Sequence, residues 1–399
     1  MKTFKNNMPM NFLKLGFILL LSCTMSLQSH AGTAAVQDDS LYEKGLALLK
    51  DLKRIEAKKA FTNTIKKQPE HAGAYFHRGL IHKHFEDYNE AIEDLKKAAF
   101  LDDKEFKKDA HFELGKLYKM LENYEKAIIN FSEVLNIEPE NHEATYLRGK
   151  CKFIAEDFES AILDFKKAVE IKPDNKLPYF EMGLAKIDLK HYDRAINNFT
   201  EVIEAHPEHS EAYFYRAFAH YQEGLSPEYS QDRKHYKAAL EDYNKTLKLN
   251  PELEEAYFDR GETKMRLGDY VGAIADFKKA LELDPHDLEA HYLKALCNYH
   301  YGYIEQAVKE YEEILEIDST YTNAHYQLGV IYYELEKYNK ALKEFDSVID
   351  LEEPHADAFV YRGYTKLELG DKAGACDDWR IADEMGDKEA HRDLKKYCD

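Results

Sequence analysis

Glycine, proline and strand-forming patterns are scarce in this chain. The 399 residues include 18 glycines and 10 prolines, and runs that alternate between apolar and polar residues, the mark of half-buried strands, are few. Hydrophobic residues make up 44% of the chain, which is enough for a core. The composition is typical of a helical protein and argues against a β-sheet fold.

Basic residues are also in short supply. Lysine and arginine number 55 against 75 acidic residues, which leaves a formal charge of −20. A surface of this sign repels polyanions. The sequence therefore predicts no nucleic-acid partner.

Motifs that carry chemistry are missing. The chain has no Gly-rich phosphate loop, no Gly-x-Ser-x-Gly elbow and no Cys-x-x-Cys pair. The densest histidine cluster is His77, His82 and His84. Side chains two positions apart on a helix point in directions about 200° apart, so His82 and His84 do not share a metal. We expect no enzymatic activity, no metal and no cofactor.

The one long apolar run lies at the N-terminus. Lys2, Lys5 and Lys14 precede an apolar stretch over residues 15–27, and the small-residue exit 29–31 follows it. This is the layout of an export signal over residues 1–31, and the run is too short to span a membrane. We expect the protein to leave the cytoplasm.

Two fates are open for this leader. It is cleaved after Ala31, or Cys23 is lipidated, because residues 20–23 (Leu-Leu-Ser-Cys) resemble a bacterial lipobox. The first gives a soluble periplasmic protein and the second a lipoprotein of the outer membrane or cell surface. Membrane contact is expected only through that lipid anchor.

A small residue recurs along the rest of the chain. Its positions are Gly45, Gly79, Gly115, Gly149, Gly183, Ala217, Gly261, Ala295, Gly329 and Gly363. The intervals are 34 or 36 residues, except for the 44 between Ala217 and Gly261. That exception is one period with a ten-residue insertion near 226–235.

Other columns keep step with the small residue. An alanine follows twelve residues later, displaced only by the insertion, and a large apolar residue follows four after that. A proline lies eight further on in six of the ten units: Pro69, Pro139, Pro173, Pro207, Pro251 and Pro285. Small residues let two helices approach closely, and proline ends the second helix.

This pattern resembles the tetratricopeptide repeat, a helix-turn-helix unit of 34 residues. The resemblance covers residues 38–387 as ten repeats, and it departs from the family where Asp103, Ser319, Glu353 and Asp387 replace the proline. It implies an all-α, right-handed superhelical solenoid in which each hairpin packs only on its neighbours. Residues 388–399 are expected to form the capping helix.

Two columns change together from repeat to repeat. Arginine precedes the small residue in five repeats, and only those five carry aspartate at one position of the second helix. The pairs are Arg78 and Asp94, Arg148 and Asp164, Arg216 and Asp242, Arg260 and Asp276, and Arg362 and Asp378. We expect an ion pair between the two helices, although shared ancestry of duplicated units would give the same pattern.

An aromatic column precedes the small residue by three positions in nine repeats. Its members are Tyr42, Phe76, Phe112, Tyr146, Phe180, Phe214, Phe258, Tyr292 and Tyr326. The resemblance implies that this aromatic ladder lines the concave groove, where rings suit peptide recognition. Packing between helices is the competing interpretation.

Acidic residues stand six positions before the small residue in seven repeats. Helix N-termini favour acids in any protein, but an acidic fringe beside a groove also favours a basic or neutral protein or peptide over an acidic one. The Lys and Asn carboxylate clamp of chaperone-binding relatives is missing from the aromatic column.

The four cysteines beyond the leader divide into two kinds. Cys151 and Cys297 share one repeat position and are expected to be buried free thiols. Cys376 takes a place that in this family packs against the next helix, here the cap that carries Cys398. In an exported protein we expect a disulfide between them, with two gap-filling thiols as the alternative.

The insertion has a helix-start signal of its own. Ser226 is typical of an N-cap and Pro227 of a first helical residue. We therefore expect the second helix of this repeat to begin at Pro227 and to project over residues 228–235.

The sequence thus predicts a scaffold that binds a partner segment in an aromatic-lined groove and performs no catalysis. Two alternatives stay open. The solenoid could instead assemble a cell-envelope or secretion complex through its edges and ends, or serve as the regulatory subunit of an enzyme complex.

Overall fold

The computed structural model describes residues 39–101, 105–227, 233–351 and 356–398. The leader expected over 1–31, with Cys23, lies outside these residues. The described segments form 21 α-helices and no strand. Within the same segments, no helix combines the length and the apolar character that crossing a membrane requires.

The helices follow one another through short turns. They are α1 (Ser40–Lys50), α2 (Arg54–Lys67), α3 (Ala72–His84), α4 (Tyr88–Phe100), α5 (Lys107–Met120), α6 (Tyr124–Ile137), α7 (His142–Ile154), α8 (Phe158–Ile171), α9 (Leu177–Asp188), α10 (Tyr192–Ala205), α11 (Ser210–Gly224), α12 (Lys234–Leu249), α13 (Glu254–Arg266), α14 (Tyr270–Leu283), α15 (Leu288–Tyr301), α16 (Ile304–Ile317), α17 (Thr322–Glu334), α18 (Tyr338–Asp350), α19 (Ala356–Glu368), α20 (Lys372–Glu384) and α21 (Lys388–Tyr397).

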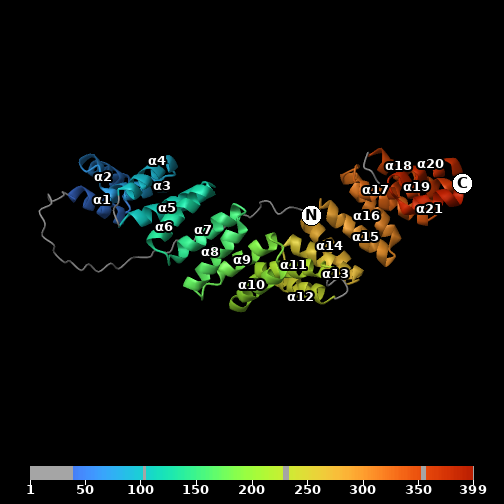
Figure 1. The fold of residues 1–399 in the computed structure, drawn as a ribbon, viewed down its shortest axis with the longest axis horizontal. Coiled ribbons are helices and arrows are strands. Elements are labelled where there is room, and N and C mark those ends of the chain that lie inside the picture. Colours follow the sequence, from blue (N-terminus) through green and yellow to red (C-terminus); the bar gives the residue numbers. More distant parts are fainter. Residues whose placement is uncertain (1–38, 102–104, 228–232, 352–355, 399) are drawn as a thin grey trace.

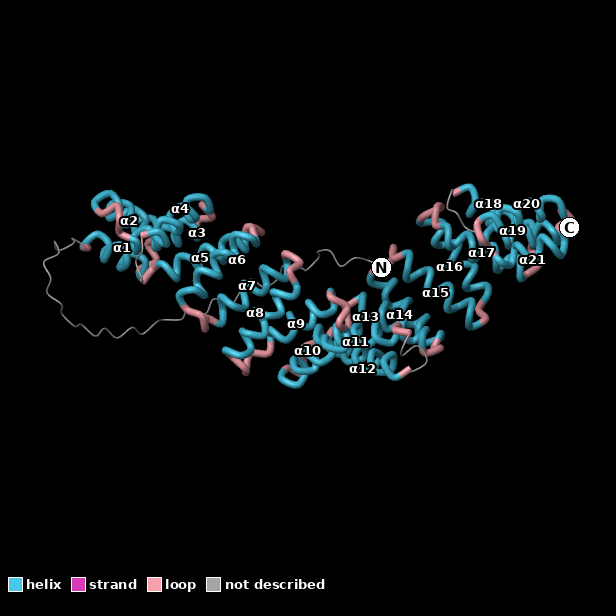
Figure 2. Tube along the Cα trace, viewed as in Figure 1, coloured by secondary structure: helices cyan, strands magenta, loops and turns pink. Residues whose placement is uncertain are grey.

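Consecutive helices form hairpins that stack into one elongated, curved array (Figure 1). Each odd-numbered helix packs against the even-numbered helix that follows it and also against the one before it. Figure 2 shows helices along the whole length, joined by short loops. The predicted all-α solenoid is confirmed, because the core runs through the array from hairpin to hairpin and is not gathered in one centre.

The recurring small residue lies where the two helices of a hairpin come closest. A Cβ added to Gly183 would stand 2.6 Å from Cε1 of Phe199 on the second helix, and Phe199 is fully buried. Real Cβ atoms do not approach that closely. The small residue and the large apolar residue therefore form one contact, and it sets the separation of the two helices.

The expected helix start at Pro227 is wrong, as the residues described on either side of 228–232 show. Pro227 and Arg233 lie in turns, and α12 begins only at Lys234. Tyr236 explains the difference, because its hydroxyl donates to the carbonyl oxygen of Gly224 over 2.7 Å and its buried ring packs beside that glycine. This tertiary contact draws α11 and α12 into longer helices that face each other and overrides the local start signal.

The Arg and Asp columns meet in all five hairpins that carry them. Arg260 Nε donates to Asp276 Oδ2 over 2.9 Å, and Nη2 donates to Oδ1 over 2.6 Å. The same bidentate pairing joins Arg78 to Asp94, Arg148 to Asp164, Arg216 to Asp242 and Arg362 to Asp378. We call each pair an Arg–Asp clamp; pairing of this geometry is stronger than a single hydrogen bond.

Each clamp also reaches the preceding hairpin. The remaining nitrogen, Nη1, donates to a side-chain oxygen sixteen residues earlier in the hairpin before, as Arg260 does to Asn244 over 2.8 Å. The acceptors for the other four arginines are Thr62, Ser132, Thr200 and Asp346. One guanidinium therefore ties three helices together.

Three hairpins without the clamp use histidine instead. Nδ1 of His325 lies 2.7 Å from Oε2 of Glu344, which replaces the clamp aspartate. His291 meets Glu310 over 3.2 Å and His111 meets Asn130 over 2.9 Å in the same way. These polar pairs span the same gap between the helices, and Nε2 of His291 and of His325 also lies near a backbone carbonyl oxygen in the loop before the hairpin, of Pro285 and Ser319.

The last helix is tied to its neighbour by a disulfide. Cys376 on α20 and Cys398, beside the end of α21, are bonded, with their Cα atoms 5.9 Å apart. The ring of Tyr397 packs on Trp379 with the centroids 5.5 Å apart. The remaining cysteines of the described segments are buried free thiols, as predicted: Cys151 and Cys297.

We predict that Arg260 and Asp276 are energetically coupled. A double-mutant cycle with R260A and D276A should give about 0.5–3 kcal/mol, because both side chains are largely buried and meet at two atoms each. The exposed pair Arg380 and Asp377, 2.8 Å apart, is the matched control and should couple far less. Equal coupling in the two cycles would mean that the clamp contributes no more than a surface ion pair.

We predict that the His325–Glu344 pair stabilises the protein most at mildly acidic pH. The hydrogen bond to Glu344 raises the pKa of His325 above 6.5. The pair then contributes fully below pH 6.5 and is lost as the pH rises through the folded-state value. H325A should lower the melting temperature more at pH 6 than at pH 8.5, whereas a variant of the exposed His286, H286A, should show no such difference. The same loss at both pH values for H325A would contradict the prediction.

We predict that reduction loosens only the end of the array. The disulfide closes a loop with a sequence separation of 22, and such a crosslink contributes about 3 kcal/mol. Hydrogen exchange with and without reductant should show faster exchange in α21 and unchanged exchange in α11. Mass spectrometry of the native protein provides the direct check, because free alkylation of both Cys376 and Cys398 without reductant would exclude the bond.

Candidate functional site

The odd-numbered helices line one surface of the array. In the middle of the chain α7 contacts α9, α9 contacts α11, α11 contacts α13 and α13 contacts α15, and α17 contacts α19 farther along. The first helices of successive hairpins therefore lie next to one another without an even-numbered helix between them. We call this surface the groove face.

The aromatic ladder lies at the base of the groove face. All nine residues are buried or half-buried. In eight of them the ring meets the large aromatic residue of its own second helix, with centroids 5.7–6.2 Å apart. The ninth, Phe76, packs on Phe106 at 5.4 Å. The ladder is thus part of the hairpin interior, and its role in binding stays a prediction.

The next hairpin covers the other side of these rings. Tyr215 packs on Phe180 at 5.8 Å, and the hydroxyl of Tyr146 donates to Glu181 over 3.0 Å. The covering residues stand two positions before the small residue: His77, Glu181, Tyr215, Gln327 and Tyr361. This column is not recognisable from the sequence, because its members differ in chemistry and share only their position.

This packing changes what a truncation of the ladder would do. If the rings only lined a groove, replacing Phe180, Phe214 and Phe258 by serine would leave the helices unaffected. Each ring instead packs edge-on against a core aromatic, and Phe214 is 5% exposed. The triple replacement would therefore leave cavities and destabilise the array, so it does not separate binding from folding.

Polar contacts link successive first helices across the groove face. Lys150 on α7 lies 2.7 Å from Glu181 on α9, and Lys83 on α3 lies 2.6 Å from Glu113 on α5. Tyr299 on α15 donates to both carboxylate oxygens of Glu334 on α17 over 2.8 Å. In these places the carboxylates already have partners.

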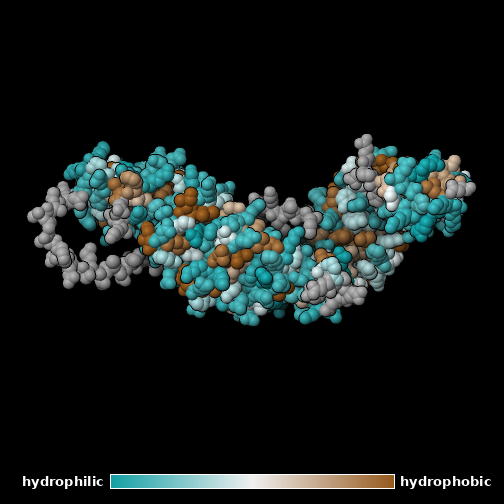
Figure 3. Space-filling view, in the orientation of Figure 1, coloured by the Kyte–Doolittle hydropathy of each residue, from teal (hydrophilic) through white to brown (hydrophobic). Residues whose placement is uncertain are grey.

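The acidic fringe six positions before the small residue is open to solvent. Its seven members are all exposed: Asp39, Asp109, Glu143, Glu211, Glu255, Glu289 and Asp357. They follow the groove face from α1 to α19, one on each of seven first helices or just before it. Figure 3 shows the hydrophilic side chains that surround apolar patches along the visible face.

Helix α13 carries acids that lack a basic partner within ion-pair distance. Burial, and then the neighbouring Glu262, raise the pKa of Asp259 to about 8. Burial and the charge of Glu289 raise the pKa of Glu262 as well. Tyr243 donates to Asp259 over 3.1 Å, and the ion pairs found among the described residues include neither carboxylate. Arg266 on the same helix and the Tyr221 hydroxyl lower the pKa of Glu262 in part.

One cluster in the described segments has the composition of a metal site. Ligand atoms of His291, Glu310 and Glu313 lie within 4.8 Å of one another. Lys294 Nζ stands 2.7 Å from Glu310 and supplies a positive charge there. The hydrogen bond that His291 donates to Glu310 raises the pKa of His291, which favours the protonated ring over a metal ligand. The arrangement fits an ion-pair network that replaces the clamp.

Comparison with known families matches tetratricopeptide repeats over residues 42–106, 180–228, 229–298 and 322–355. Residues 120–202 also match the family described as anaphase-promoting complex, cyclosome, subunit 3. None of these descriptions names an enzyme. No curated protein sequence matches the chain.

Solved structures of repeat proteins are similar to the array. The C-terminal part of a tetratricopeptide-repeat protein from Cytophaga hutchinsonii has 20% identity and a TM-score of 0.52, covering 62% of this chain and 97% of that one. A repeat protein from Parabacteroides merdae has 23% identity and a TM-score of 0.46, covering 64% and 98%. YrrB, described as a tetratricopeptide-repeat protein with an unusual peptide-binding site, has 23% and 0.43, covering 49% and 95%.

The first of these structures shares the fold of this chain. The tetratricopeptide matches together extend over more than half of the sequence, from α1 to beyond α18. The chain therefore belongs to the tetratricopeptide-repeat family.

Proposed function

We propose that this protein is a scaffold without catalytic activity that binds a basic or neutral segment of a partner protein along the groove face. The acid excess over α13 carries the proposal. Asp259 and Glu262 are partly buried, mutually repelling carboxyls with raised pKa values. A lysine or arginine from a partner would supply the missing positive charge.

The exposed fringe extends the same preference along the array. Glu211, Glu255 and Glu289 stand on three successive first helices, α11, α13 and α15. An extended basic segment that crosses these helices would meet one carboxylate at each step, with the inner acids of α13 at the centre. Attraction of this kind raises the association rate and selects partners by charge.

Three further features belong to the proposal. The repeats number ten over residues 38–387, the leader over 1–31 exports the chain to the periplasm or cell surface, and Cys23 is the lipidation site if the leader is processed as a lipoprotein signal. The apolar run and its basic flank support export.

We predict that a lysine- and arginine-rich peptide binds more tightly as the pH rises from 6.5 to 9. Asp259 loses its proton with a pKa of about 8, and only the charged form attracts a cation. Bound cations lower that pKa, so binding releases a proton and affinity increases with pH. Titration of a fluorescent basic peptide at several pH values measures the effect.

The double variant D259N/E262Q tests the site. It should weaken binding roughly tenfold and abolish the pH dependence, because the titrating carboxyls are gone. E204Q/E316Q removes the same number of charges from exposed positions of α10 and α16 and should bind like the unaltered protein. Equal weakening by both variants would reduce the effect to net charge, and an unchanged D259N/E262Q would refute the site.

A further inference from the structure

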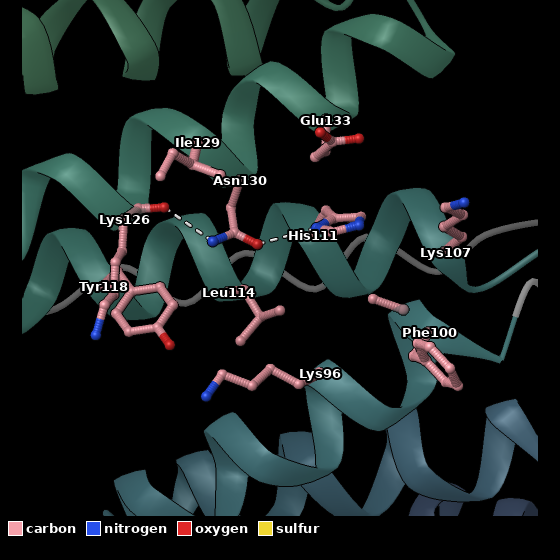
Figure 4. Close-up of a pocket in the computed structure, with 11 residues that line it drawn as sticks. Lys96, Phe100, Lys107, His111, Leu114, Tyr118, Lys126, Ile129, Asn130 and Glu133 are labelled. Carbon is pink, nitrogen blue, oxygen red and sulfur yellow. Dashed lines mark hydrogen bonds between the residues drawn. The ribbon is translucent and has the colours of Figure 1, made fainter.

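A cavity of about 520 Å³ opens between α4, α5 and α6. Figure 4 shows side chains from the three helices converging on it. On α5 it is lined by Leu114, which lies two residues from Phe112 and hence about 200° around the helix from it. The cavity therefore lies on the side of α5 that faces away from the aromatic ladder.

The cavity stands where other hairpins hold the Arg–Asp clamp. Leu114 takes the place of the clamp arginine, and Asn130 takes the place of its aspartate. In the clamped hairpins the arginine also donates a hydrogen bond to one side chain of the preceding hairpin, and Lys96 occupies that position here. The guanidinium that ties three helices together is therefore missing here, and the pair of His111 and Asn130 takes its place between α5 and α6.

Ala99 enlarges the space. It lines the cavity and stands in a column that is otherwise filled by larger aliphatic residues: Ile65, Leu135, Val169, Ile203, Leu247, Leu281, Leu315 and Ile349. The only other exception is Asp383 in the last hairpin. A hairpin that lacks both the clamp and the aliphatic filler has room for a side chain from outside.

The rim of the cavity is apolar where other hairpins are polar. Phe100 is 78% exposed and Ile129 is 55% exposed, and both line the cavity. The position of Phe100 carries a polar or charged residue in every other hairpin. Exposed rings and branched chains beside a hollow mark interaction sites more often than isolated surface residues do.

The charge around this rim is the reverse of the charge of the chain. Among the described residues, Lys96, Lys107 and Lys126 line the cavity with one acid, Glu133, in a protein with a net charge of −20. Lys96 also contacts Glu93 over 3.2 Å in an exposed pair, which a ligand carboxylate can replace at little cost.

We propose that this cavity binds an acidic segment of a partner protein that inserts one bulky apolar side chain. The apolar side chain would fill the space over Ala99 and Leu114, between Phe100 and Ile129. Flanking carboxylates would meet Lys96, Lys107 and Lys126 at the rim. This site is independent of the groove face, and the scaffold would hold a basic and an acidic segment on different sides of the array.

The test uses the whole mature protein and a fluorescent peptide that has one phenylalanine flanked on both sides by glutamates. We expect saturable binding that weakens with salt. A99L places in the cavity the side chain that four other hairpins carry at this column, and it should abolish binding while the melting temperature stays the same or rises. A peptide with serine in place of the phenylalanine should bind roughly tenfold more weakly or worse.

Charge variants keep the test valid if A99L does not fold. K96E/K126E should weaken binding of the acidic peptide roughly tenfold, whereas K166E/K167E, exposed lysines of α8, should leave it unchanged; Lys166 matches Lys96 in repeat position. Binding that A99L and K96E/K126E leave intact would overturn the proposal. Absence of peptide binding together with A99L-sensitive binding to anionic phosphatidylglycerol vesicles, or to a second copy of the chain, would also overturn it.

Discussion

The contact between a small residue on the first helix and a large apolar residue on the second governs this structure. It leaves no room for a Cβ at Gly183, so it fixes how near the helices lie and which faces they turn to the next hairpin. Repetition of that contact makes the array effectively one-dimensional, because each hairpin is buried only by its two neighbours. The clamps add a second connection at intervals, and where they are absent the local structure is free to differ.

Much of this arrangement is readable from the sequence because contacts within one hairpin recur at fixed spacing. Gly183 lies sixteen residues before its large apolar partner Phe199, and Arg260 lies sixteen residues before Asp276. The structure joins both pairs. The contact of each clamp arginine with the preceding hairpin, such as that of Arg260 with Asn244, was not predicted. The acceptor in the five hairpins is Thr, Ser, Asn or Asp, so the column shows no single residue type. The start of α12 was wrong because Tyr236 and Gly224, which are twelve residues apart, outweigh the local signals of Ser226 and Pro227.

The aromatic ladder shows why a column alone does not identify a binding surface. A position on the inner side of the first helix also borders the second helix of the same hairpin and the first helix of the next. Phe180 satisfies both neighbours at once, against Phe199 and Tyr215. Evidence for binding has to come from charges that the packing leaves without an ion pair, and over α13 these are Asp259 and Glu262, which no ion pair among the described residues includes.

The same criterion distinguishes the hairpin α5–α6 from the others. Where the clamp is replaced by His291 or His325, a glutamate carboxylate pairs with the histidine ring. In α5–α6 the histidine meets a neutral amide, Asn130, and the aliphatic filler is missing as well. The array tolerates this loss because its neighbours bury the same hairpin from both sides. A repeated fold can therefore give up stabilising contacts in one unit without unfolding, and the space released there becomes available for recognition.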